Sequence, residues 1–190
     1  MAKTMNWMTA LAALTWAGYA LADHTCFTAD QNSGELGFSG VAEGTPFRGY
    51  FGQFHVRLCL HGDDLSTAEI EVAVQTGSAD VGNRDGNQAL KDGEFFAVDR
   101  FPEATWKSGE IEIDGDQYLA EGELSIKEVS ASQPVRLSLD TESEPWTLSG
   151  GVEIMRLDWE VGVGEFEDPD FIRNRVDLRF ELELEPDGES

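Results

Sequence analysis

The stretch VDLRFELEL, residues 176–184, alternates apolar and charged side chains without a break. Apolar residues occupy every second position from Val176 to Leu184, and Asp, Arg or Glu occupies each position between them. Successive side chains of a β-strand point to opposite faces, so this period of two predicts a strand with one buried and one hydrated face. Such strands are typical of antiparallel sheets, because parallel strands are usually covered on both faces.

The same alternation recurs along the chain, whereas helical periodicity is almost absent. It is clearest in residues 54–60, 68–74, 118–126 and 135–139. Turn signals separate these segments, and Asp114-Gly115-Asp116 predicts a tight hairpin. One short helix is expected, from about Gly86 to Lys91.

These segments predict an all-β fold, an antiparallel β-barrel of about eight strands with one short helix. Closure into a barrel removes the sheet edges that would otherwise invite aggregation. A β-sandwich stays open as an alternative, because periodicity does not separate the two. The difference matters because a small barrel can hold a ligand in its lumen, whereas a sandwich has a solid interior.

The pattern changes phase between Val152 and Phe166, where Leu157 and Trp159 fall on the opposite parity from Val152 and Ile154. A β-bulge near Met155 would return the apolar residues to one face. Without a bulge, Arg156 and Asp158 face inward, and an internal ion pair between them is then the favoured arrangement.

The chain of 190 residues carries 13 Lys and Arg against 37 Asp and Glu, a net charge of −24. This charge repels phosphate backbones and anionic headgroups, so nucleic acid is not an expected partner and electrostatic docking to a membrane is disfavoured. With 41% hydrophobic and 26% charged residues, the composition is that of a globular protein.

The first residues resemble a secretory signal. Lys3 is followed by a largely apolar run from Met5 to Leu21, which closes on Ala20-Leu21-Ala22, a small-x-small cleavage pattern. We expect a cleaved signal peptide at residues 1–22, one mature domain at residues 23–190, and a periplasmic location. A membrane anchor is the alternative, but the apolar core is shorter than the ~20 residues of a spanning helix.

Export affects how the two cysteines are interpreted. Cys26 and Cys59 are expected to form a disulfide, because thiols usually pair in an oxidising compartment. A metal site that also uses His24 and His61 is the alternative, although the spacing matches no zinc motif.

No catalytic residues are predicted, because the sequence lacks the nucleophile-elbow, metalloprotease, P-loop and dinucleotide-binding motifs. The acidic cluster Glu165, Glu167, Asp168 and Asp170 could hold calcium weakly, but it lacks an EF-hand loop, and no metal site is expected. We therefore expect a protein that is not an enzyme.

Phenylalanine is abundant, with 11 residues that gather in residues 38–54 and 95–101. A core of large apolar side chains is one interpretation. The other is a tunnel lined by these rings that shelters a hydrocarbon, since apolar burial contributes ~25 cal/mol per Å² without any charged anchor.

A series of segments, in the same order along nearly the whole mature chain, resembles the YceI family of exported polyisoprenoid-binding proteins. The segments are SGELGF (33–38), GYFGQF (49–54), NRD (83–85) with Leu90, FF (95–96), FP (101–102), ATWKS (104–108), YLAEGELSI (118–126), PVRL (134–137), RLDW (156–159) and VGVGEF (161–166). The sequence departs from the family at residues 127–130, where a glycine is usual, and at Phe166, where Trp is commoner.

The resemblance implies a lipocalin-like barrel that carries or stores a long isoprenoid lipid of the polyprenyl or quinone type, without another cofactor. It also implies a periplasmic setting, with a cytochrome b561-type membrane protein as a partner. Under this hypothesis the short helix acts as a lid, and Arg84, or Arg156 if no bulge intervenes, meets the headgroup. An ion pair of Arg84 with Asp85 or a neighbouring acid is the alternative for that side chain. The expected lumen residues are Phe38, Phe54, Val56, Ile70, Val72, Phe95, Phe96, Phe101 and Tyr118.

Two other functions stay open. The protein could be a solid-cored accessory subunit of a periplasmic or membrane redox system, in which the phenylalanines only pack. It could also be a lipid-modifying enzyme, which requires a proton-transfer pair inside the barrel.

Overall fold

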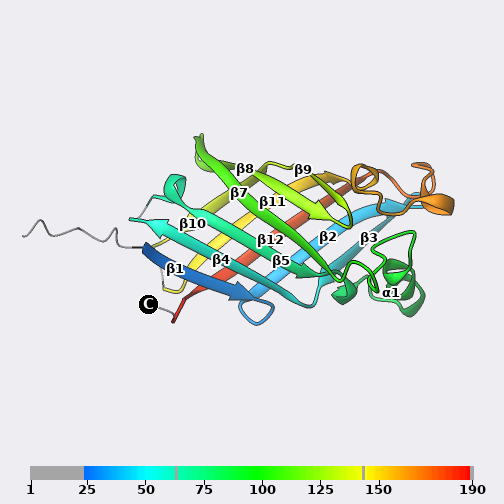
Figure 1. Cartoon of the computed structure of the whole chain (residues 1–190), viewed down its shortest axis with the longest axis horizontal. Coiled ribbons are helices and arrows are strands. Elements are labelled where there is room, and N and C mark those ends of the chain that lie inside the picture. The colour runs from blue at the N-terminus through cyan, green and yellow to red at the C-terminus, as the bar shows by residue number, and fades with distance from the viewer. Residues whose placement is uncertain (1–23, 63, 143, 189–190) are drawn as a thin grey trace, which may run out of the picture.

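The computed structural model describes residues 24–62, 64–142 and 144–188. The predicted signal peptide, residues 1–22, lies outside the described residues. Within them, twelve strands form one antiparallel sheet (Figure 1). Their bounds are β1 His24–Asp30, β2 Gly34–Ala42, β3 Thr45–Phe51, β4 Phe54–His61, β5 Glu69–Gln75, β6 Ala79–Asp80, β7 Glu103–Asp114, β8 Gln117–Ile126, β9 Val129–Ser132, β10 Val135–Asp140, β11 Trp146–Met155 and β12 Arg175–Pro186.

Helical structure is short. The predicted helix is present as α1, Arg84–Lys91, and starts two residues earlier than expected because the side chain of Asn83 caps it by accepting a hydrogen bond from the Gly86 N–H at 2.8 Å. Four 3₁₀ turns complete the described structure: η1 Leu65–Thr67, η2 Thr76–Ser78, η3 Arg156–Trp159 and η4 Gly164–Phe166.

The twelve strands combine into eight long ones. Four of the long strands consist of two consecutive strands that lie end to end, with a short interruption between them: β1/β2, β3/β4, β5/β6 and β9/β10. The two members of each pair bond to the same neighbouring long strand. Each long strand pairs with the next one in the sequence, and β12 closes the ring by pairing with β2 and, at Phe27↔Pro186, with β1. The eight-stranded antiparallel barrel is thereby confirmed, and the sandwich alternative is wrong.

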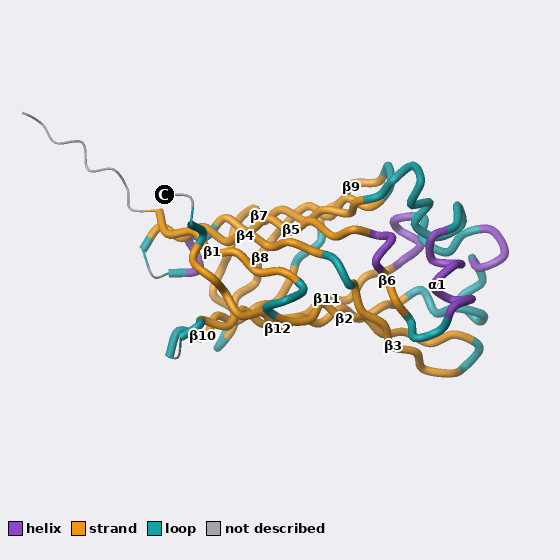
Figure 2. Tube along the Cα trace, turned by 90° about the horizontal axis from the view of Figure 1, so that it is seen from below, coloured by secondary structure: helices purple, strands orange, loops and turns teal. Residues whose placement is uncertain are grey.

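The two ends of the barrel differ. At one end, which we call the α1 end, α1 and the turns η3 and η4 lie beside the hairpin of β2 and β3 (Figures 1 and 2). At the other, the far end, β1 begins and the described chain ends (Figure 1). The far end also holds the predicted hairpin, in which Asp114 pairs with Gln117 around Gly115, whose φ is 69°.

The expected bulge near Met155 is absent. β11 stays in register with β12 from Trp146 to Met155, and the phase change arises because the strand ends there and η3 begins. A register shift occurs instead in β7, between Ser108 and Ile111.

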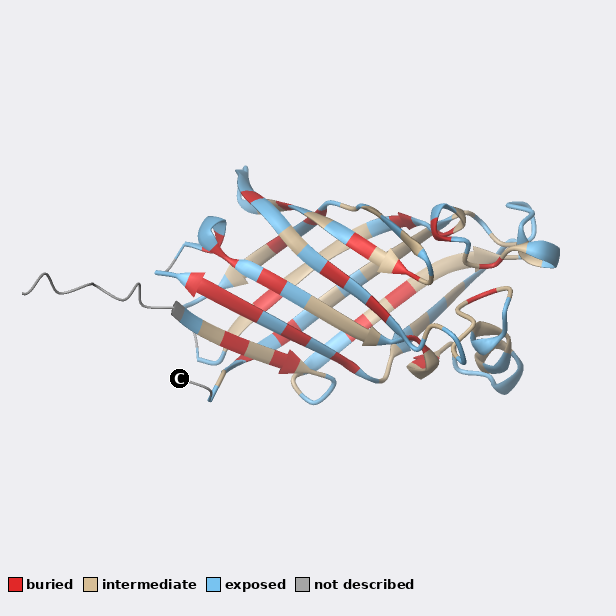
Figure 3. Cartoon of the chain, viewed as in Figure 1, coloured by how far each residue is buried: buried red, intermediate tan, exposed pale blue. Residues whose placement is uncertain are grey.

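Burial follows the predicted alternation along β4 from Phe54 to Leu58, and buried Cys59 interrupts it (Figure 3). Towards the far end, inward-facing side chains fill the barrel. We call this group the plug, and it includes Phe27, Leu58, Leu60, Leu65, Ile111, Ala120, Trp146 and Leu184. Leu58 and Leu60 are both 0% exposed, so the far end of the barrel is solid.

The predicted disulfide is present. Cys26 and Cys59 are register partners on β1 and β4, with Cα atoms 4.0 Å apart. Both side chains lie on the outer face, because Leu58 and Leu60 on either side of Cys59 point inward. Disulfide formation leaves no thiolate for the alternative metal site.

Replacing both cysteines, as Cys26→Ser with Cys59→Ser, is expected to lower the free energy of unfolding by about 3–4 kcal/mol, the loop-closure entropy for a separation of this size. Urea denaturation of the oxidised protein and the double variant measures the change. Because the bridge lies on the outer face, hydrocarbon binding should be unchanged in the folded variant, and lost binding would show that the bridge shapes the lumen.

Candidate functional site

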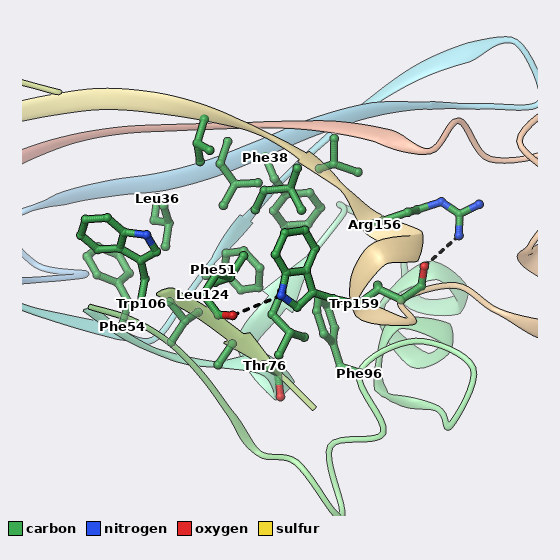
Figure 4. Close-up of a pocket in the computed structure, with 18 of the residues that line it drawn as sticks. Leu36, Phe38, Phe51, Phe54, Thr76, Phe96, Trp106, Leu124, Arg156 and Trp159 are labelled. Atoms are coloured by element: carbon green, nitrogen blue, oxygen red, sulfur yellow. Dashed lines mark hydrogen bonds between the residues drawn. The ribbon is translucent and has the colours of Figure 1, made fainter. Parts of the chain in front are cut away.

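A cavity of about 460 Å³ occupies the half of the barrel between the plug and the α1 end (Figure 4). Its wall comes from every long strand, and α1 and the segments around Phe95 and Phe166 cover its end. The polar residues in its lining are Thr76, Asn83, Thr105, Gln133 and Arg156.

Most of the predicted lumen residues line this cavity: Phe38, Phe54, Val56, Ile70, Val72, Phe95, Phe96 and Arg156. Three do not. Tyr118 packs at the far end beside the plug, Phe101 stacks under the Arg100 guanidinium at 4.8 Å, and Arg84 is exposed on α1.

Phe47 and Phe51 also line the wall; both belong to the phenylalanine cluster at residues 38–54 but were not among the expected lumen residues. The sequence reasoning missed four further aromatic residues of the wall: Trp106, Trp159, Phe166 and Phe180. Trp106 and Phe180 could have been predicted from the alternation of their strands. Alternate residues share a face, so Trp106 lies on the face of Ala104 and Phe180 on the face of Leu178. Trp159 and Phe166 carry no such signal, because they belong to the turns η3 and η4.

The barrel is hollow in this half, which contradicts the solid core of the accessory-subunit alternative. Val72, Val74, Val152 and Phe180 face inward and line the cavity, yet each keeps an intermediate exposure. Plug residues with the same orientation, such as Leu58, are fully buried. These four side chains therefore border the cavity, as Leu58 does not.

Glycines help to keep the lumen open. A Cβ on Gly122 would lie 2.4 Å from Cε2 of Trp106, and one on Gly150 would lie 2.6 Å from Cζ of Phe180. The two rings thus lie against glycine backbone on the inner wall. The aromatic residues line the lumen and do not fill it.

The buried polar side chains of the wall are satisfied within the protein. Trp106 Nε1 donates to the Gln133 carbonyl at 2.9 Å, and Trp159 Nε1 donates to the Leu124 carbonyl at 3.2 Å (Figure 4 shows the latter). Thr76 Oγ1 donates to the Phe101 carbonyl at 2.9 Å. In the described part of the chain, every buried side-chain nitrogen or oxygen has a hydrogen-bond partner. The lumen therefore offers a guest contact with carbon and few free hydrogen bonds.

Arg156 is only 4% exposed and makes five hydrogen bonds to backbone carbonyls. These carbonyls belong to Val161, Gly162, Phe166, Ile172 and Arg173. All five N–H groups of the guanidinium are thus occupied, which leaves none for a headgroup. Asp158 is exposed, so the expected internal Arg156–Asp158 pair is wrong.

Carbonyl acceptors satisfy the Arg156 guanidinium, and its burial lowers its pKa from the ordinary arginine value. The contacts join residues 156–162 to residues 166–173 at the α1 end. We infer that Arg156 positions Trp159 and Phe166 in the lining, since both lie on the segments that it ties together.

Two neighbouring segments complete the cover. The Glu94 carbonyl accepts hydrogen bonds from the N–H groups of Gly162 and Val163, at 2.7 and 2.9 Å. The rings of Phe95 and Phe166 pack with centroids 4.8 Å apart. The segment after α1 is therefore tied to the segment that Arg156 organises.

Asp80 on β6 is one attachment point of the helix α1. Asn87 Nδ2 donates to Asp80 Oδ1 at 2.9 Å, the Gly82 N–H donates to the same oxygen at 2.7 Å, and the Tyr50 hydroxyl donates to Oδ2 at 3.2 Å. These hydrogen bonds, that from Asn87 most of all, lower the pKa of Asp80 below its usual value. The charged carboxylate thus anchors the helix, whose residues Gly86, Ala89 and Leu90 face the cavity.

The described lining of the cavity has one ionisable side chain, that of Arg156. Among the described residues that line the cavity, there is no His, Cys, Ser, Asp, Glu or Lys. Across residues 24–62, 64–142 and 144–188, no group of three or more His, Cys, Asp or Glu is placed to hold a metal ion.

The part of the chain that the structure describes contains no helix of the length and hydropathy needed to span a membrane.

Replacing Arg156 with Met is expected to lower the free energy of unfolding by at least ~3 kcal/mol, because buried carbonyl acceptors lose their donors. Arg156→Lys should recover only part of this loss, since an ammonium group has three donors without the planar geometry. Arg173→Lys is the control on the same segment; its exposed side chain should cost less than ~0.5 kcal/mol. Thermal and urea melts measure the three variants, and an Arg156→Met protein of unchanged stability would refute the role assigned to this side chain.

The fold and sequence match known proteins over most of their length. The chain is 28% identical to a UPF0312 protein of Pectobacterium atrosepticum over 148 residues, which is 76% of each chain. Its structure superposes on the crystal structure of BcnA from Burkholderia cenocepacia with a TM-score of 0.77, at 22% identity, covering 83% of this chain and 99% of BcnA.

A second solved structure is a polyisoprenoid binding domain from Saccharophagus degradans implicated in plant cell wall breakdown. It matches with a TM-score of 0.63 at 14% identity and covers 84% of this chain and 98% of that domain. At these identities the two solved structures establish the shared barrel fold. The profile of the YceI-like domain matches residues 27–184, almost the whole barrel. The chain therefore belongs to the YceI-like domain family.

Proposed function

We propose that the protein binds one long isoprenoid chain of the polyprenyl or quinone type, with the hydrocarbon in the lumen and the headgroup at the α1 end. The observation that carries the proposal is the hollow half of the barrel, about 460 Å³, whose polar groups are satisfied by the protein. A guest that needed hydrogen bonds would lose its bonds to water and regain few in this lumen.

The headgroup is directed to the α1 end because the plug closes the other end. Arg84 and Lys91 lie on the exposed side of α1, where a polar or anionic headgroup could meet them. The wall shows no such group, and Arg156 is fully used by carbonyls. Arg84 is thus the headgroup residue of this proposal, in place of Arg156.

The relatives support the choice of isoprenoid over other hydrocarbons. A barrel of the same fold is a polyisoprenoid binding domain. Export through a cleaved leader, transport or storage as the purpose of binding, and a cytochrome b561-type partner are further parts of the proposal that rest on family resemblance. A lipid-modifying enzyme is not favoured, because the described lining lacks an acid–base pair.

The proposal is tested by native mass spectrometry of residues 23–190 secreted into the periplasm of a bacterial host and purified without detergent. We expect a bound species that organic solvent extracts and whose mass fits an isoprenoid. A protein that shows only its own mass, and that takes up neither farnesol nor geranylgeraniol when they are added, would contradict the proposal.

Filling the lumen should abolish binding without unfolding the barrel. Val72→Trp places an indole in the cavity, and Ala73→Trp places the same ring on the outer face of the same strand as a control. Loss of two buried methylene contacts alone weakens binding by about tenfold, so we expect at least that loss for Val72→Trp and none for Ala73→Trp. Quenching or enhancement of the lumen tryptophans, Trp106 and Trp159, measures binding of geranylgeraniol. Equal affinity of the two variants would place the hydrocarbon site elsewhere.

A further inference from the structure

The cavity ends abruptly inside the barrel. Along β4, Val56 lines the cavity, whereas Leu58, the next inward-facing residue, does not. Along β12 the same change occurs between Leu182 and Leu184. The boundary between the lumen and the plug is therefore a layer of side chains that crosses the barrel, and we call this layer the floor.

Leu58 belongs to this boundary. It is 0% exposed, and its register partner on β5 is Ile70, which lines the cavity. Its register partner on β1 is Phe27, which belongs to the plug. The Leu58 side chain thus separates the open half of the barrel from the filled half.

We propose that Leu58 sets the longest hydrocarbon tail that the protein accepts. This inference rests on the proposed function and deepens it, because it assigns chain-length selectivity to a residue outside the cavity lining. Each methylene that a tail buries in the lumen strengthens binding by about fourfold. Once the tail reaches the floor, an added methylene must stay outside or displace close-packed side chains, so the gain stops.

The chain provides a matched control for Leu58. Leu60 is the next inward-facing residue of β4, has the same side chain, and is also 0% exposed. It lies deeper in the plug, so truncating Leu60 opens space that Leu58 still separates from the lumen. Leu58→Ala removes about three carbon atoms next to the lumen, whereas Leu60→Ala removes the same atoms away from it.

The test is an affinity series on the folded wild-type protein and the two variants. The probes are straight-chain primary alcohols that differ by one methylene, and binding is followed by the fluorescence of Trp106 and Trp159. For the wild type, we expect affinity to rise by about fourfold per methylene and then level off at a defined length. For Leu58→Ala, the levelling length should increase by about two to three carbons, and for Leu60→Ala it should stay where it is in the wild type.

The outcomes separate this inference from the proposed function. A wild-type series that levels off, with Leu58→Ala levelling at the same length, overturns the role of Leu58 and leaves hydrocarbon binding intact. An equal shift in both variants also overturns it, because a general loosening of the plug would then control length. A wild-type protein that binds none of the alcohols refutes the proposed function itself. If Leu58→Ala fails to fold, Leu58→Val provides a smaller truncation with a smaller expected shift in the same direction.

Discussion

The structure depends on closure of the sheet around a space that the side chains do not fill. Pairing of β12 with β1 and β2 leaves no free edge among the eight long strands, so the backbone polar groups of the wall bond along the sheet. Side-chain donors that reach the wall, including the indoles of Trp106 and Trp159, are satisfied by carbonyls. An apolar lumen is stable under these conditions because it leaves no polar group without a partner.

The barrel divides stability and binding between its two halves. The plug, the disulfide and the hairpin between β7 and β8 gather at the far end, where inward-facing side chains pack against one another. The α1 end is organised by other means. Arg156 holds the turns through five carbonyls, and Asp80, which also accepts hydrogen bonds from Gly82 and Tyr50, holds α1 through Asn87. Solid packing supplies the stability, and the cover of the cavity depends on a few polar contacts.

Much of this arrangement could be predicted from the sequence, because period-two alternation is a local property. It predicted β4, β5, β8, β10 and β12, and parity within these strands placed Phe54, Val56 and Val72 on the lumen side. The sequence predictions fail where the position of a side chain depends on the end of a strand or on contacts with distant segments. The phase change at Met155 predicted a bulge, but the strand ends there and a 3₁₀ turn begins at Arg156. The carbonyls that bind the Arg156 side chain come from segments that no local sequence pattern identifies. Likewise, Tyr118 has the inward parity of a lumen residue but lies at the plug level, because parity gives the face of a strand and not the depth along the barrel.

Xenon under pressure tests directly whether half of this barrel encloses an apolar cavity, because apolar cavities bind the gas. In crystals of residues 23–190 stripped of lipid, we expect xenon in the lumen among Val72, Val152 and Phe180, and none beyond Leu58. A lumen occupied by its own side chains, or by a chain of ordered water bonded to the wall, would contradict it.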